Sequence, residues 1–153
     1  MKEINLSTII DALSMGGRGF TTYFNTDTYE VRTIIEMEKL DYGIYSEKED
    51  IPEWIEDTIK FLDEIFYNEN WIVIDVNPYQ GYRILEKFCY KMEDDDLSET
   101  LSVIIRGKGA FSRFRYFAEK HDILNDWYGF EHNEYKKTAI LWCEENDVYF
   151  YED

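Results

Sequence analysis

The residues best suited to chemistry lie between Arg106 and Tyr128, where the charge of the chain is locally reversed. The 153-residue chain carries 16 Lys and Arg against 33 Asp and Glu, a net charge of −17. Between Ile104 and His121, however, Glu119 is the only acid. The same stretch holds five basic side chains, Arg106, Lys108, Arg113, Arg115 and Lys120. A basic cluster in so acidic a chain is a candidate site for an anion.

The turn Gly107-Lys108-Gly109 precedes a predicted helix, and the first N–H groups of a helix favour an anion. Lys108 and Arg113 would hold a phosphate, a carboxylate or an acidic segment of a partner there. In the alternative, the glycines only permit a tight turn between helices, and the basic residues pair with the chain's own acids. The sequence alone leans toward this alternative, because G-x-G is common and no strand precedes it.

Aromatic residues alternate with the basic ones, a pattern that also occurs in surfaces that stack nucleic-acid bases. The helical spacing of Phe111, Phe114 and Phe117 favours a core instead, because it places them on one face. The strong negative charge also opposes direct nucleic-acid binding. The candidate binding residues are Arg106, Gly107, Lys108, Gly109, Arg113, Arg115, Trp127 and Tyr128.

Nothing else in the sequence indicates catalysis, so the chain is more readily a binding protein than an enzyme. The only histidines, His121 and His132, form no metal-binding spacing and are expected at the surface or at a helix end. Three adjacent acids at 94–96 are expected to cap a helix. Cys89 and Cys143 are expected to be buried, reduced thiols. We therefore predict no catalytic residues, no metal and no cofactor.

The elements that position this stretch follow from hydrophobic periodicity. A helix over 6–13 should end at Gly16-Gly17, and a hairpin should follow with strands over 20–25 and 29–35. A strand over 71–76 should add to the hairpin and make a three-stranded sheet. Helices are predicted from Asn77-Pro78 to 92, over 97–105, from Phe111 to Ala118 and from about 130 to 146, with a short turn or helix over 122–128.

The segment over 36–69 holds twelve acids and only three lysines. Within it, apolar residues from Ile51 to Phe66 recur at helical spacing and predict an amphipathic helix with one acidic face. Such a face is usually solvated, but it would also suit a basic partner.

These patterns predict an α+β fold with a small antiparallel sheet of about three strands packed against a helical bundle. The length predicts a single domain over 1–153, with a hairpin-containing part over 1–76 and a helical part over 77–153. The N-terminus lacks the features of a signal peptide, and no run of 18 apolar residues occurs. A cytoplasmic protein that does not bind membranes is therefore expected.

The run GKGAFSRFRYF, followed by DWYGF and AILWCEENDV, resembles the uncharacterised protein family 0158 of bacteria. The resemblance extends to Ile4–Leu13, to TYFNTDTYEV and to the region from Tyr82 to Phe88, about two thirds of the chain in all. The acidic segment over 37–70 departs from the pattern. The family implies no activity, substrate or cofactor.

The leading functional hypothesis is a non-enzymatic binding or regulatory protein whose basic GKGAF turn contacts an acidic or phosphorylated partner. One alternative is an acidic mimic of DNA that blocks a nucleic-acid-binding protein through the helix over 51–68. A further alternative, which the sequence supports less, is an enzyme that holds a phosphate at the same turn.

Overall fold

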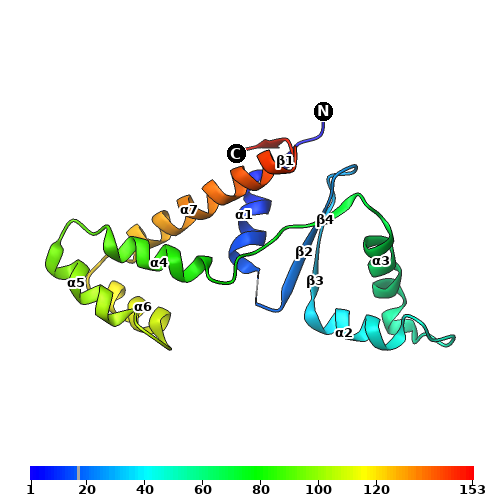
Figure 1. The fold of residues 1–153 in the computed structure, drawn as a ribbon, viewed down its shortest axis with the longest axis horizontal. Helices are drawn as coiled ribbons and strands as arrows, with labels where there is room; N and C mark the ends of the chain where they lie inside the picture. The colour runs from blue at the N-terminus through cyan, green and yellow to red at the C-terminus, as the bar shows by residue number, and fades with distance from the viewer. Residues whose placement is uncertain (17) are drawn as a thin grey trace. The chain divides into compact units, whose positions relative to one another are not determined.

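The computed structural model describes residues 1–16 and 18–153 and divides the chain into two compact units. The first unit comprises Met1–Asn77 and Ala139–Asp153, and the second comprises Pro78–Thr138. In the sequence, the second unit is therefore inserted between two segments of the first (Figure 1). Whether the chain behaves as one domain, as its length predicts, stays a prediction.

The sheet lies in the first unit and confirms the predicted α+β class. It consists of β2 (Phe20–Asn25), β3 (Val31–Ile35) and β4 (Trp71–Val73), in the order β3-β2-β4, and all neighbours are antiparallel. The predicted hairpin and its third strand are thus confirmed, although the third strand ends at Val73 and not at Val76. The helices of this unit are α1 (Leu6–Met15), α2 (Glu36–Tyr45), the short 3₁₀ helix η1 (Glu53–Ile55) and α3 (Glu56–Tyr67).

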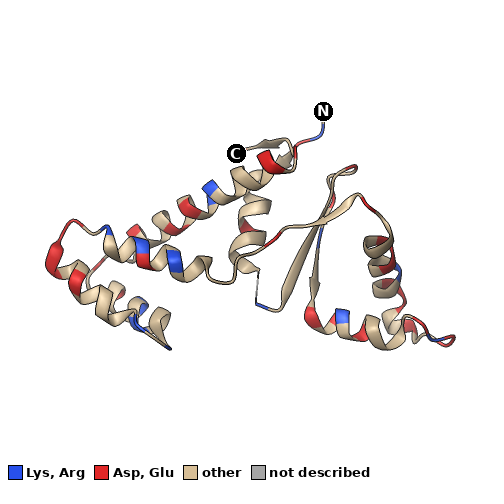
Figure 2. Ribbon diagram, viewed as in Figure 1, with Lys and Arg blue, Asp and Glu red and all other residues tan. Residues whose placement is uncertain are grey.

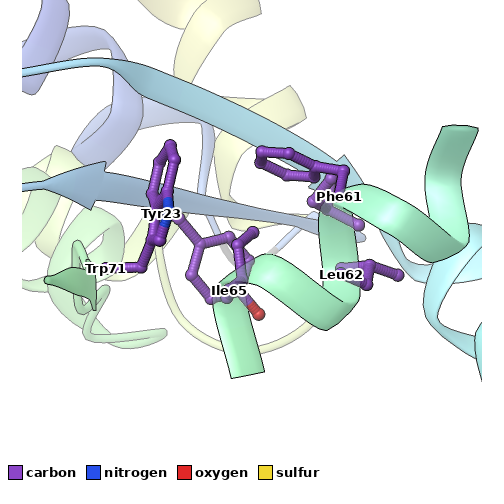
Figure 3. Close-up of a cluster of buried hydrophobic side chains, with 6 residues drawn as sticks. Tyr23, Phe61, Leu62, Ile65 and Trp71 are labelled. Carbon is purple, nitrogen blue, oxygen red and sulfur yellow. The ribbon is translucent and has the colours of Figure 1, made fainter. Parts of the chain in front are cut away.

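Successive side chains of a strand point to opposite faces of the sheet. In β2, the side chains on both faces are buried by packing. On one face Tyr23 packs with α3 and β4 in a cluster that also contains Ile34, Phe61, Leu62, Ile65 and Trp71 (Figure 3). On the other face Phe24 is fully buried, and its ring contacts those of Tyr29 and Trp142 edge-on at 5.0 and 5.5 Å. The central strand therefore anchors the core of this unit.

The ends of the chain are joined within the first unit by β1 (Ile4–Asn5) and β5 (Phe150–Tyr151), which pair in parallel. The Asn5 side chain donates a hydrogen bond to Asp153 Oδ2 at 2.8 Å and also caps α1 by accepting from the Ser7 N–H. The predicted helix over 6–13 is confirmed. Its stop at Gly16 is confirmed too, whereas Gly17 lies outside the described residues.

Helix α2 was not expected from the sequence. It follows β3 without a loop and packs on α3, where the Tyr42 hydroxyl donates to Asp63 Oδ1 at 2.6 Å. The rings of Tyr42 and Phe66 also meet edge-on at 5.2 Å. The amphipathic helix predicted from Ile51 is present, but its first turn is η1 and α3 proper begins at Glu56.

The second unit is helical and contains α4 (Gln80–Tyr90), α5 (Asp95–Ile104), α6 (Ala110–Lys120) and most of α7 (Leu124–Glu145). Phe88 lies at the centre of its core, with its ring 5.4 to 5.9 Å from those of Phe114, Trp127 and Phe130. The predicted start of the last helix near residue 130 is wrong, because the segment from Leu124 already belongs to α7. None of the described helices combines the length and the hydropathy that a membrane crossing requires.

Candidate functional site

The candidate site is the turn between α5 and α6, which the sequence placed correctly. Gly107 and Gly109 adopt left-handed backbone conformations, with φ angles of 74° and 78°. Residues with a β-carbon adopt this region at a cost, so the two glycines allow the chain to reverse within a few residues. Arg106, Gly107, Lys108 and Gly109 are all exposed. The turn is therefore accessible to a partner.

The Arg113 side chain holds the turn in place. Its Nε donates to the Ile104 carbonyl at 2.8 Å, its Nη2 donates to the Arg106 carbonyl at 2.5 Å, and its Nη1 donates to the Lys108 carbonyl. The last carbonyls of a helix have no partners within the helix, and a guanidinium presents several donors in a rigid plane. Arg113 thus satisfies the end of α5 and the turn that follows it.

No N-cap side chain accepts from the first N–H groups of α6. Gly109 is the N-cap residue, and it has no side chain that could accept from them. Arg113 uses three of the five N–H donors of its guanidinium. Lys108 and Arg113, which were predicted to hold an anion together, therefore have different roles. Arg113 shapes the turn, and Lys108 is exposed on it.

The basic residues of the site have no acidic partner within the described residues. Arg106, Lys108 and Arg115 are exposed, and no ion pair of the described chain involves them. Lys120 lies over the Tyr116 ring at 4.4 Å. The alternative in which these residues pair with the chain's own acids finds no support among the described ion pairs, and its other half, a tight turn made possible by glycines, is confirmed.

The remaining candidate residues are not gathered at the turn. Arg115 follows Arg113 by two positions, so the two side chains leave α6 on different sides, about 200° apart. Trp127 is only 4% exposed, with its ring 5.2 Å from that of Phe114, so it supports the site through packing. Tyr128 is about half exposed on α7. The predicted aromatic core is confirmed for Phe114 and Trp127, whereas Phe111 is exposed.

The other residues with chemical potential have structural roles. Asp94 caps α5 by accepting from the Leu97 N–H at 3.1 Å, as predicted. The His121 ring stacks on Phe117 at the end of α6, and His132 is exposed. Burial raises the pKa of the Cys89 and Cys143 thiols to about 11, which keeps both protonated. Both cysteines are free and buried, which confirms that prediction.

Two pockets of the described chain lie in the first unit, and no residue of the turn over 106–109 lines either of them. One, of about 200 Å³, is lined by α1 and the strands and includes Asp11 and Thr22. The other, of about 400 Å³, lies near the chain ends and includes Glu3 and Glu144. Among the described residues, no group of three or more His, Cys, Asp or Glu side chains is placed to hold a metal ion.

Charge is distributed unequally between the two units. The first unit contains 22 Asp and Glu against 6 Lys and Arg, whereas the second contains 11 against 10. Acidic segments recur along α2, α3 and the loop between them, and basic segments mark α6 (Figure 2). The acidic character of the chain therefore belongs to the first unit, while the second is close to neutral.

Comparison with known proteins places the site within a family. The sequence profile described as Uncharacterised protein family (UPF0158) matches residues 55–153, which include α3 to α7. A curated relative, UPF0158 protein PA5073 of Pseudomonas aeruginosa, is 24% identical over 91 residues, or 57% of this chain and 60% of the relative. The chain thus spans less than two thirds of that protein. No solved structure matches.

Proposed function

This chain belongs to the Uncharacterised protein family (UPF0158), and from that premise we propose that it is a non-enzymatic binding protein whose basic turn contacts an acidic or phosphorylated segment of a partner. One observation carries the proposal. The cations of Arg106 and Lys108 are exposed on a turn fixed by Arg113, and no acid of the described chain pairs with them. An acidic chain offers many carboxylates, so cations left without them are available to an outside anion.

The chemistry of the turn suits a protein segment better than a nucleic acid or a membrane. The patch is small, and the net charge of −17 repels any extended polyanion that approaches the whole molecule. A single phosphate or a short run of carboxylates needs only a few cations and the N–H groups at the start of α6. We place this interaction in the cytoplasm.

The test is a pull-down from host lysate, read by mass spectrometry, with the variant Arg106→Glu/Lys108→Glu. Arg113 is left intact because its side chain shapes the turn. The control Lys60→Glu/Lys91→Glu makes the same charge change at two other exposed lysines. A partner retained by the wild type and the control but lost by the turn variant supports the proposal. Equal retention by all three proteins contradicts it.

A second candidate is supported by the charge of the first unit. Its surplus of acids, with Glu53, Glu56, Asp57 and Glu64 exposed on η1 and α3, suits an acidic mimic of DNA that occupies a nucleic-acid-binding protein. Binding of this kind should weaken steeply with salt and with Glu56→Gln/Glu64→Gln. It should be indifferent to Arg106→Glu/Lys108→Glu, so the same pull-down separates the two candidates.

A further inference from the structure

Helix α2 carries three large apolar side chains that the described chain leaves uncovered. Met37, Leu40 and Ile44 are 66%, 62% and 54% exposed, and no residue of α2 is buried. Their spacing of three and four residues places them along one side of the helix. Burying a Leu or Met side chain stabilises a protein, because it removes apolar surface from water. A row of three such side chains in water therefore indicates a surface that another molecule covers.

The opposite side of α2 makes the contacts of this helix with its own unit. Tyr42 bonds Asp63 and packs on Phe66, and the Tyr45 ring meets Trp54 edge-on at 5.7 Å. Lys39 donates to the Thr21 hydroxyl at 2.7 Å. These residues fix α2 against α3 and the sheet. The row of Met37, Leu40 and Ile44, here called the apolar row, is thus presented by a helix that is already anchored.

Acidic residues border the apolar row. Helical geometry places Glu36 and Asp41 at its two sides, and Glu47 follows beyond the C-terminal end of α2. No ion pair of the described chain involves these three carboxylates. The unit that contains them holds 22 acids against 6 basic residues. An apolar strip between unpaired carboxylates is complementary to an apolar strip between cations.

We propose that α2 docks a basic amphipathic helix of another protein, with apolar side chains on the apolar row and Lys or Arg beside Glu36 and Asp41. Helices recognise one another through apolar residues at such spacings, as amphipathic targets do. A second copy of this chain is a poorer occupant, because it would bring two strongly acidic units together. This surface is separate from the basic turn in sequence and in chemistry, so the inference does not depend on the proposed function.

The inference also differs from nucleic-acid mimicry in what it requires. A mimic needs carboxylates alone, whereas this docking surface needs the apolar side chains as well. Replacing Leu40 with Ser leaves every charge unchanged and removes a side chain that has no described polar or ring contact. The substitution is therefore expected to weaken docking about tenfold or more, and to lower the stability of the fold no more than a serine does at any exposed helix position.

The test uses a fluorescent synthetic peptide of leucine and lysine, spaced so that its leucines share one face of a helix. Its anisotropy is titrated with the wild type, with Leu40→Ser and with Leu141→Ser, which changes another half-exposed leucine, on α7. A peptide of the same composition with its leucines scrambled around the helix is titrated alongside. We expect the wild type and Leu141→Ser to bind the amphipathic peptide alike, and Leu40→Ser and the scrambled peptide to give much weaker binding.

Four outcomes would overturn the inference. The first is equal binding by all three proteins or of both peptides, which would show that charge alone is recognised. The second is the absence of binding to the wild type. The third is a dimer in analytical ultracentrifugation that Leu40→Ser dissociates, which would assign the row to a second copy. The fourth is an unfolding temperature for Leu40→Ser well below that of Leu141→Ser, which would show that the chain itself covers the row.

Discussion

The Arg113 guanidinium connects the end of one helix with the beginning of the next. It lies on α6 but donates to carbonyls of Ile104, Arg106 and Lys108, which would otherwise face only water. A β-carbon at Gly109 would come within 2.9 Å of Arg113 Nη1, so the glycine also makes room for this side chain. The shape of the basic turn therefore depends on one arginine and two glycines together.

Replacing Arg113 with Lys should destabilise the turn although the charge is kept. A lysine ammonium cannot present a planar fork to three carbonyls. We expect the free energy of unfolding to fall by about 1–2 kcal/mol. Urea denaturation would measure this, with Arg115→Lys as the control, because the described structure assigns Arg115 no hydrogen bond. Equal stability of the two variants would show that the hydrogen bonds of Arg113 contribute little.

Tyr42 joins α2 to α3 through its hydroxyl. The hydrogen bond to Asp63 is the main cause that raises the pKa of Tyr42 to about 12, and burial and the charge of Asp63 act in the same direction. A tyrosinate at this position would face the carboxylate without a proton between them. The neutral phenol is thus part of the folded structure.

Two results should follow for Tyr42→Phe. Near neutral pH the variant should be less stable by about 1 kcal/mol, because the partly buried Asp63 carboxylate loses its donor. The folded pKa is above the unfolded value, so this stabilisation is complete below about pH 10 and disappears as the pH rises to about 12. Chemical denaturation at a series of pH values would measure the difference between the two proteins. A difference that does not change through this range would contradict the assignment.

At the scale of elements, the sequence predicted most of the second unit and the sheet, because their patterns are strong. Periodic apolar residues indicate α1, α4, α5 and α6, and the polar turn 26–28 between two β-rich runs indicates the hairpin. The last helix was predicted too short because Asn125 and Gly129 resemble turn residues, whereas the buried Trp127 and the partly buried Phe130 hold the segment in α7.

Helix α2 and the two short strands β1 and β5 were not predicted from the sequence. Helix α2 has apolar residues at helical spacing, but they lie among many acids and beside Gly43, which are also typical of a loop. The pairing of β1 with β5 joins residues almost a whole chain apart, and two-residue strands carry no periodicity. At the site, the turn could be predicted from the sequence, but its exposure and the role of Arg113 could not, because both depend on how the turn packs and where its carbonyls lie.

Gly16 ends α1 at a place where a side chain has no room. A β-carbon there would lie 2.1 Å from Val76 Cγ2 and 2.9 Å from the Ala12 carbonyl oxygen, although the backbone conformation is an ordinary one. Gly16→Ala should therefore lower the free energy of unfolding by about 1–3 kcal/mol through overpacking. At the control position Gly43, in α2, an added β-carbon would meet no other part of the chain within 4 Å, so Gly43→Ala should instead raise stability by roughly 0.5–1 kcal/mol. Thermal unfolding of both variants would measure the contrast, and a loss of stability in both would contradict this account.

At the scale of the whole molecule, the two units differ in the balance of their charges. The first unit holds nearly all of the net charge of −17, and the ion pair between its Arg32 and Glu30 joins side chains that are both about half exposed. Its acids therefore repel one another with little compensation. The second unit has nearly equal numbers of acids and bases, and Glu134 bonds both Lys87 and Lys137. The Lys87 hydrogen bond is the main cause that lowers the pKa of Glu134.

Salt should consequently stabilise this protein. Raising the ionic strength from about 0.01 M to 0.15 M shortens the range of charge repulsion from about 30 Å to about 8 Å. The repulsion within the first unit should weaken more than the few exposed ion pairs, so we expect the unfolding temperature to rise by about 2–4 °C. Differential scanning calorimetry at the two salt concentrations would measure the shift.

Glu49→Gln/Asp50→Asn, which removes two acids of the first unit, should reduce the shift more than Glu93→Gln/Glu119→Gln in the second. An unfolding temperature that falls with salt would show that ion pairs outweigh repulsion, and equal effects of the two variants would show that the charge imbalance is not confined to the first unit.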